Sequence, residues 1–185
     1  MKQIFFLILF VISLGANAQS KLDYAQYNNL TEVEGTPYVI ASIEERGKMA
    51  IIKTNSLLFV NSETGETTEV DFSESPNVPR FEQIKIDSLN INLILVSART
   101  VDLDEKKGID WNDPIQIIIL STDGKERTQL TDDKLYVRNW VVNKEAGTIV
   151  VSGYYDTNNN GKYDKTDKAE IAIYDLKTFK LISRI

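Results

Sequence analysis

The stretch that decides the fold is Ile117-Ile118-Ile119-Leu120-Ser121-Thr122-Asp123-Gly124-Lys125, an apolar run that leads into a turn. The same pattern recurs around Gly65 and around Phe179. Alignment of Gly124 with these two residues gives spacings of 59 and 55 residues. The Thr-Gly and Asp-Gly pairs favour tight hairpins, because glycine takes positive φ without steric cost. Self-similarity at a fixed period indicates a repeat protein.

Two further strands joined by a short turn precede each of these segments. Alternation of apolar and polar residues predicts strands through much of the chain and no convincing helix. The unit is four antiparallel strands, and it occurs three times, at about 36–72, 80–131 and 135–185. In the first unit we expect separate strands over 38–44 and 49–54. The expected fold is all-β, with a single domain over 19–185.

Such a unit resembles the blade of a β-propeller. Ile173-Tyr174-Asp175-Leu176 matches a phrase that often ends the blades of TolB-like exported propellers, although their usual Ser-Pro-Asp-Gly turn is absent from all three units. The resemblance implies blades around an axis, but closed propellers have about four to eight of them. We therefore expect an open propeller-like fan, or half-propeller, with Gln19–Pro37 covering one edge. A homodimer that closes a six-bladed ring and a β-sandwich are the alternatives.

The third unit contains a candidate calcium loop, Asp156-Thr157-Asn158-Asn159-Asn160-Gly161-Lys162-Tyr163-Asp164-Lys165-Thr166-Asp167. Oxygen-bearing side chains at positions 1, 3, 5, 9 and 12, with glycine at position 6, suit a hard cation that takes six to eight oxygen ligands. The loop resembles those of EF-hand and dockerin-type repeats, although position 12 is aspartate instead of glutamate. The predicted ligands are Asp156, Asn158, Asn160, the backbone carbonyl of Lys162, Asp164 and Asp167. A metal-free Asn/Gly-rich hairpin is the alternative.

The second unit contains a similar acidic stretch at the corresponding place. Carboxylates at positions 1, 3, 9 and 12 define a second candidate metal site, formed by Asp102, Asp104, Asp110 and Asp113. Lys106 occupies position 5, and the glycine is displaced to position 7. The Lys106 ammonium could replace a cation by folding over Asp104 and Asp110. An acidic surface hairpin with exposed ion pairs is the alternative.

The first 18 residues have the pattern of a secretory signal peptide. Lys2 precedes the apolar run Ile4–Leu14, and Ala16-Asn17-Ala18 is a small-x-small cleavage site. The run is shorter than the roughly 20 residues that a membrane-spanning helix needs. No cysteine follows it, so a lipoprotein anchor is excluded. We expect cleavage after Ala18, a periplasmic or secreted location, and no membrane insertion.

Composition excludes several classes of function. The chain has no cysteine and no histidine, which rules out disulfides, Cys/His zinc sites and histidine-dependent triads. Its formal net charge of −6 argues against nucleic acids and anionic membrane surfaces, which select positive patches.

These observations favour an exported, calcium-binding, non-catalytic interaction or scaffold protein of the cell envelope, with a protein or a glycan as partner. The candidate loop lies between strands, so a sensor that reorients helices is not expected. One alternative is a carbohydrate-binding module that uses Trp111 and the acidic loops; a simpler expectation is that Trp111 packs over its own loop. Another alternative is a glycoside hydrolase with paired carboxylates. Trp140 is expected in the core, and Tyr154, Tyr155 and Tyr163 are expected to be ordinary strand residues.

Overall fold

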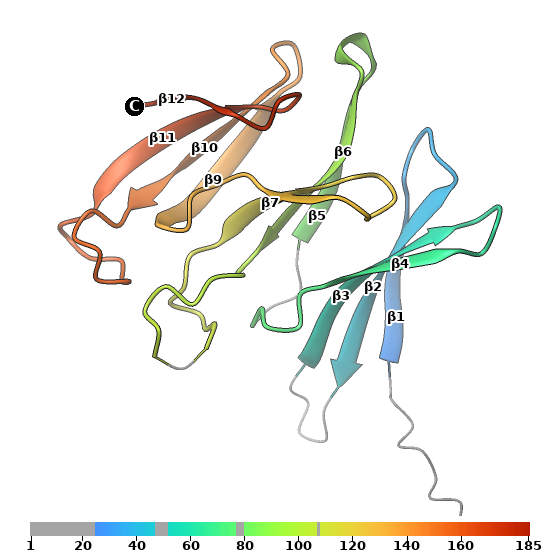
Figure 1. The fold of residues 1–185 in the computed structure, drawn as a ribbon, viewed down its shortest axis with the longest axis horizontal. Helices are drawn as coiled ribbons and strands as arrows, with labels where there is room; N and C mark the ends of the chain where they lie inside the picture. The colour runs from blue at the N-terminus through green and yellow to red at the C-terminus, as the bar shows by residue number, and fades with distance from the viewer. Residues whose placement is uncertain (1–24, 47–51, 77–79, 107) are drawn as a thin grey trace, which may run out of the picture.

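The computed structural model describes residues 25–46, 52–76, 80–106 and 108–185, and these residues form three β-sheets (Figure 1). The first sheet contains β1 (Ala25–Glu32), β2 (Tyr38–Arg46), β3 (Ile52–Asn61) and β4 (Thr67–Asp71). The second contains β5 (Arg80–Ile86), β6 (Ile91–Ala98), β7 (Gln116–Leu120) and β8 (Arg127–Gln129), with the 3-10 turn η1 (Asp87–Leu89) after β5. The third contains β9 (Leu135–Asn143), β10 (Thr148–Tyr155), β11 (Lys168–Asp175) and β12 (Leu181–Arg184).

Each sheet is an antiparallel meander in which every strand pairs with its neighbours in sequence. The three sheets pack face to face in chain order, and the second sheet lies between the other two (Figure 1). The described residues do not close a ring, so the arrangement is an open fan. The prediction of an all-β fold with three four-stranded antiparallel units in an open, propeller-like fan is therefore confirmed.

The second sheet is buried on both faces, which explains its unbroken apolar strands. Leu95 and Ile117 point into a core shared with the third sheet, which supplies Ile149 among others. The alternate residues Ile94 and Ile118 point into a separate core shared with the first sheet. Successive side chains of a strand face opposite sides, so an apolar run without alternation is what a central sheet requires.

The predicted strands of the first unit were wrong in two respects. Ala25–Glu32 does not simply cover an edge but forms β1, which pairs with β2. The segments predicted as two strands around Lys53–Ser56 form one strand, β3. The polar tract continues the strand because Asn55 is buried: its backbone carbonyl accepts from Phe72 and its side-chain Nδ2 donates to the Ser75 carbonyl. The first unit therefore begins at β1, not at residue 36.

The turn alignment on which the repeat was built is confirmed. Gly65, Gly124 and Phe179 lie in the last hairpin of their sheets, with φ of +77°, +75° and +59°. Gly124 is held most tightly, because an added Cβ would lie 2.5 Å from the ring of Phe59. The equivalence therefore reflects one left-handed backbone position that each repeat needs.

The predicted signal peptide, residues 1–18, lies outside the described residues. Within the described ranges, no helix has the length and apolarity needed to cross a membrane.

Candidate metal centre

Two acidic loops lie at the same end of neighbouring sheets (Figure 1). The second-sheet loop, Asp102–Asp113, lies between β6 and β7, and the third-sheet loop, Asp156–Asp167, lies between β10 and β11. The loops touch, because a Cβ added at Gly161 would lie 2.6 Å from the carbonyl oxygen of Leu103. Gly161 therefore allows the two backbones to meet as well as permitting the turn.

The C-terminal halves of the loops share their hydrogen bonds. The N–H of Asp164 donates to Oδ2 of Asp167 at 2.8 Å, and the N–H of Asp110 donates to Oδ2 of Asp113 at 2.7 Å. In each loop the N–H two residues further on donates back to Oδ1 of Asp164 or Asp110 at 2.7 Å. Positions 9 and 12 are therefore structurally equivalent in the two loops.

The N-terminal halves are also alike. The N–H of Gly161 donates to Oδ2 of Asp156 at 2.9 Å, and that of Gly108 donates to Oδ2 of Asp102 at 3.0 Å. The two glycines occupy positions 6 and 7 of their loops, so the displacement seen in the sequence is absorbed without loss of this bond. Position 1 therefore accepts the glycine N–H in both loops, but Oδ1 of Asp156 also accepts the Asn160 N–H whereas Oδ1 of Asp102 is buried without a hydrogen-bond partner.

Asp156 is a buried carboxylate, with 1% of its surface exposed. Its oxygens accept from the N–H groups of Asn160 and Gly161, and its own N–H donates to the carbonyl of Lys134. Among the described residues, no lysine or arginine nitrogen lies within 4.0 Å of a carboxylate oxygen of the third-sheet loop. Burial of a charge is costly unless it is paired or hydrogen-bonded, and here backbone N–H groups and not a cationic side chain supply that compensation.

Asp164 is the centre of the polar side chains in the third-sheet loop. Its Oδ2 accepts from Nδ2 of Asn160 at 2.6 Å and from Nδ2 of Asn158 at 3.2 Å. The Thr166 hydroxyl, followed by the Thr166 N–H and the two amides, holds the pKa of Asp164 well below its usual range. The oxygen and nitrogen of an asparagine amide occupy equivalent places, so a half-turn of the amide exchanges them. Rotation of the Asn158 and Asn160 amides would therefore turn their oxygens toward a cation bound at Asp164.

Asp167 differs from its counterpart in one respect that matters for metal binding. Its Oδ2 accepts the Asp164 N–H, while its Oδ1 is buried and has no hydrogen-bond partner. In Asp113, which is 4% exposed, Oδ1 accepts the N–H of Leu103 at 2.9 Å, so both oxygens are engaged. The third-sheet loop therefore keeps a carboxylate oxygen at position 12 that the second-sheet loop has already used.

Lys106 pairs with one of the two predicted carboxylates. Its Nζ lies 3.2 Å from Oδ2 of Asp104. The contact expected with Asp110 is not formed; Asp110 accepts instead from the backbone N–H and the side-chain amide of Asn112. An ammonium fixed beside Asp104 repels a cation, so the four carboxylates of this loop fit a metal less well than the third-sheet loop does.

The donor set of the third-sheet loop consists of three carboxylates, two amides and one predicted backbone carbonyl. Hydrogen bonds connect Asn158 and Asn160 to Asp164, Asn160 to Asp156, and Asp164 to Asp167. The Lys162 N–H donates to Oδ1 of Asn160 at 2.8 Å, which places its peptide in the same network. No group of three or more His, Cys, Asp or Glu side chains in the described ranges could hold a metal by itself. The all-oxygen mixture fits calcium, which accepts amide and carbonyl oxygens as well as carboxylates.

The aromatic residues near the loops do not all lie where the sequence indicated. Trp111 is 65% exposed, with the Arg99 guanidinium 5.3 Å from its ring, so it is not packed down onto its loop. Trp140 is half-buried against the core and its Nε1 donates to Glu82. The Tyr163 ring lies 4.7 Å from that of Tyr154.

Sequence reasoning missed a polar cleft of about 460 Å³ beside these loops. Its wall includes Arg99, which follows β6, together with Tyr136 and Arg138 on β9. These residues carry no motif, and two sheets bring them together. The alternation of apolar and polar residues along β9 indicates which of its side chains face the core, but not which residues of the second sheet lie beside it.

No protein family and no curated protein matches the sequence. Among solved structures, the chain resembles the acylaminoacyl peptidase of Pyrococcus horikoshii, with 10% identity and a TM-score of 0.46 over 88% of this chain. It also resembles an acylaminoacyl peptidase in complex with Z-Gly-Gly-Phe-chloromethyl ketone, with 13% identity and a TM-score of 0.47 over 87% of this chain. In both cases the chain spans 25% of the length of the matched protein. Likenesses of this strength indicate no activity.

Proposed function

We propose that this chain is an exported, calcium-binding, non-catalytic scaffold or interaction protein of the cell envelope. The observation that carries the proposal is the third-sheet loop, in which the buried Asp156 has no cationic partner among the described residues and Oδ1 of Asp167 is buried without a hydrogen bond. Calcium would neutralise these carboxylates and use the free oxygen. Export rests on the signal-peptide pattern of the first 18 residues.

A structural role for the ion is supported by the position of the loop. It connects β10 to β11, which pair along their full length, so there is no pair of helices for calcium to reorient. The ion would instead fix a twelve-residue connection against the Leu103 backbone of the neighbouring sheet. Because calcium would bind the folded loop and not the unfolded chain, it adds stability by mass action.

A partner surface is supported by exposed apolar side chains of the third sheet. They come from three of its strands, β9, β11 and β12, and are Val141, Ile171, Leu181 and Ile182. A partner protein, a glycan-bearing surface or a second copy of the chain could cover some of them.

The calcium proposal is tested by thermal unfolding in EGTA and in millimolar calcium. At a calcium concentration about a hundredfold above the Kd, linkage gives about 2.7 kcal/mol, equivalent to a rise in Tm of roughly 5 to 10 °C for a domain of this size. Asp156→Ala should abolish the rise. Asp102→Ala, at the same position of the second-sheet loop, is the matched control and should keep it.

Two results would overturn the proposal. If the unaltered protein shows no calcium-dependent rise in Tm, the third-sheet loop is a metal-free polar turn. If Asp102→Ala removes the rise and Asp156→Ala leaves it, calcium binds to the other loop.

A further inference from the structure

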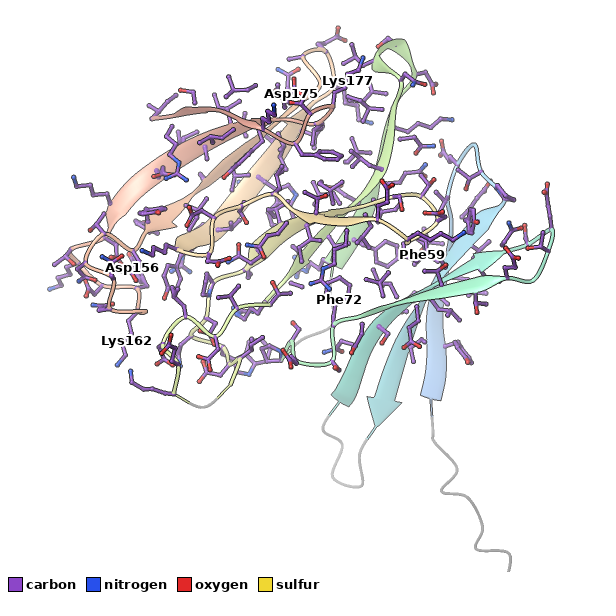
Figure 2. All side chains as sticks on the ribbon, in the orientation of Figure 1. Phe59, Phe72, Asp156, Lys162, Asp175 and Lys177 are labelled. Carbon is purple, nitrogen blue, oxygen red and sulfur yellow. The ribbon has the colours of Figure 1, made fainter. Side chains whose placement is uncertain are left out.

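The cleft between the second and third sheets has the composition of a site for a small anion. Three cationic side chains line it, Arg99, Arg138 and Lys162, together with two carboxylates, Asp104 and Asp113. The lining therefore carries one net positive charge, in a protein whose net charge is −6. Figure 2 marks Lys162 on the third-sheet loop, close to Asp156. A cleft of about 460 Å³ is of the size that holds small ligands.

Each of the two arginines lies over aromatic rings. The Arg138 guanidinium lies 5.0 Å from the ring of Tyr163 and 5.7 Å from that of Tyr154, and the Arg99 guanidinium lies 5.3 Å from the ring of Trp111. Burial lowers the pKa of Arg99; Asp113 and Asp110 oppose this effect and the nearby Arg138 adds to it. The Arg99 Nε already donates to the Asp113 carbonyl at 2.9 Å, so Arg99 contributes mainly its charge. Stacking of Arg138 fixes the plane of its guanidinium, whose edge geometry suits the two oxygens of a carboxylate.

A buried hydroxyl points to a ligand independently of these charges. Tyr136 lines the cleft and is only 6% exposed, yet its hydroxyl has no hydrogen-bond partner. Burial, with the carboxylates of Asp156 and Asp113, raises the pKa of Tyr136 to about 12, so the hydroxyl keeps its proton at neutral pH. An unpaired buried hydroxyl is costly, and an acceptor oxygen of a ligand in the cleft would remove that cost.

Two exposed rings lie on the rim of the same cleft. Trp111 is 65% exposed and Tyr163 is 48% exposed, and they come from the second-sheet and third-sheet loops respectively. Large exposed rings beside hydrogen-bonding groups provide faces against which the C–H side of a sugar ring can pack. Asn112, also on the rim, offers an amide that can donate to and accept from hydroxyls.

We propose that this cleft binds a sugar that carries one carboxylate, such as a uronic acid residue of a glycan. Arg138 and Lys162 hold the carboxylate, the hydroxyl of Tyr136 donates to a ring or carboxylate oxygen, and Trp111 packs against the ring. A phosphate ester fits less well, because its second charge would meet Asp104 and Asp113. This inference does not rest on the calcium proposal, and each can fail without the other.

The test is an NMR titration of the ¹⁵N-labelled protein with methyl β-D-glucuronide and with methyl β-D-glucoside, which differ in the carboxylate. The chain has two tryptophans, so the indole N–H of Trp140, which donates to Glu82 and does not line the cleft, serves as an internal control for that of Trp111. We expect the glucuronide to shift the Trp111 signal in a saturable way and the glucoside to bind at least about tenfold more weakly. Titrations in EGTA and in calcium separate failure of this site from failure of the metal site.

Three variants locate the site. Arg138→Ala should weaken glucuronide binding by at least about tenfold, because a charge-assisted hydrogen bond is lost. Tyr136→Phe should weaken it about fivefold while leaving the Tm unchanged or higher, since the deleted hydroxyl has no partner in the protein. Arg127→Ala is the matched control; this arginine stacks on Phe72 outside the cleft, and its loss should leave binding unchanged.

The proposal is overturned if both sugars shift Trp111 equally, or if neither shifts it at tens of millimolar. It is also overturned if Arg138→Ala and Tyr136→Phe bind the glucuronide as the unaltered protein does. A fall in Tm for Tyr136→Phe would mean that the hydroxyl already has a structural partner, which removes the main argument for a ligand.

Discussion

The second-sheet loop and the third-sheet loop have nearly the same backbone but use their carboxylates differently. In both, position 4 is left-handed, with φ of +54° at Glu105 and +56° at Asn159. In the second-sheet loop, an ammonium at position 5 pairs with Asp104. In the third-sheet loop the same position is Asn160, whose amide contacts Asp164. A shared hydrogen-bond pattern therefore does not by itself make two loops equivalent as cation sites.

The comparison shows what distinguishes a preorganised turn from a metal ligand set. Both loops fold their backbone around the carboxylates at positions 1, 9 and 12. The second-sheet loop supplies its own positive charge and saturates both oxygens of Asp113 with backbone N–H groups. The oxygen left without a donor is Oδ1 of Asp167, at position 12, in the third-sheet loop and Oδ1 of Asp102, at position 1, in the second-sheet loop. Under the proposed function, a diffusible cation takes the place that Lys106 fills in the other loop.

The largest expected effect comes from the loop glycines. Gly161→Ala should reduce the free energy of unfolding by roughly 2 to 4 kcal/mol, because φ is +68° and the new Cβ would meet the Leu103 backbone. Gly108→Ala should cost only about 1 kcal/mol, since φ is +79° but nothing lies within 4 Å. Urea unfolding of the two variants measures the difference.

That difference is the contribution of contact between the loops. Equal losses for Gly161→Ala and Gly108→Ala would mean that the third-sheet loop moves away from Leu103 at little cost. The two loops would then behave as independent hairpins whose contact contributes little to stability.

A smaller effect is expected at position 5. Lys106→Asn gives the second-sheet loop the residue type found in the other loop, and removal of an exposed ion pair should cost at most about 1 kcal/mol. We expect calorimetry to find one calcium ion per chain both before and after this change, because Asp113 has no free oxygen. A second ion in the variant would show that Lys106 alone separates the two loops.

The sequence predicted the features that depend on local geometry. The left-handed turns at Gly65, Gly124 and Phe179 follow from turn residues at fixed places after an apolar strand, and their spacing revealed the repeat. Strand β1 was missed because it lies at the edge of its sheet and its apolar residues Tyr27 and Leu30 are exposed, so they mark no buried face.

The features of the candidate site likewise fall into those that depend on local sequence and those that depend on the packing of different sheets. The candidate ligand positions of the third-sheet loop lie within twelve residues, so the spacing alone was enough to propose them as one site. The contact of Gly161 with Leu103 and the cleft around Arg138 join segments from different sheets. Nothing in the local pattern of either segment specifies the other, and only the packing of the sheets does.

The smallest expected effect is at position 4, where the two loops need the same left-handed residue and have different ones. Asparagine tolerates this conformation better than glutamate does. Glu105→Asn should therefore stabilise the protein by about 0.5 kcal/mol, and Asn159→Glu should destabilise it by a similar amount. Asn159 also accepts from Lys134 at 2.5 Å, but a glutamate carboxylate can accept from the same ammonium, so this contact does not decide the sign. Chemical unfolding of both variants is the measurement; a loss of stability in Glu105→Asn would mean that the two loops share φ at this position for different reasons.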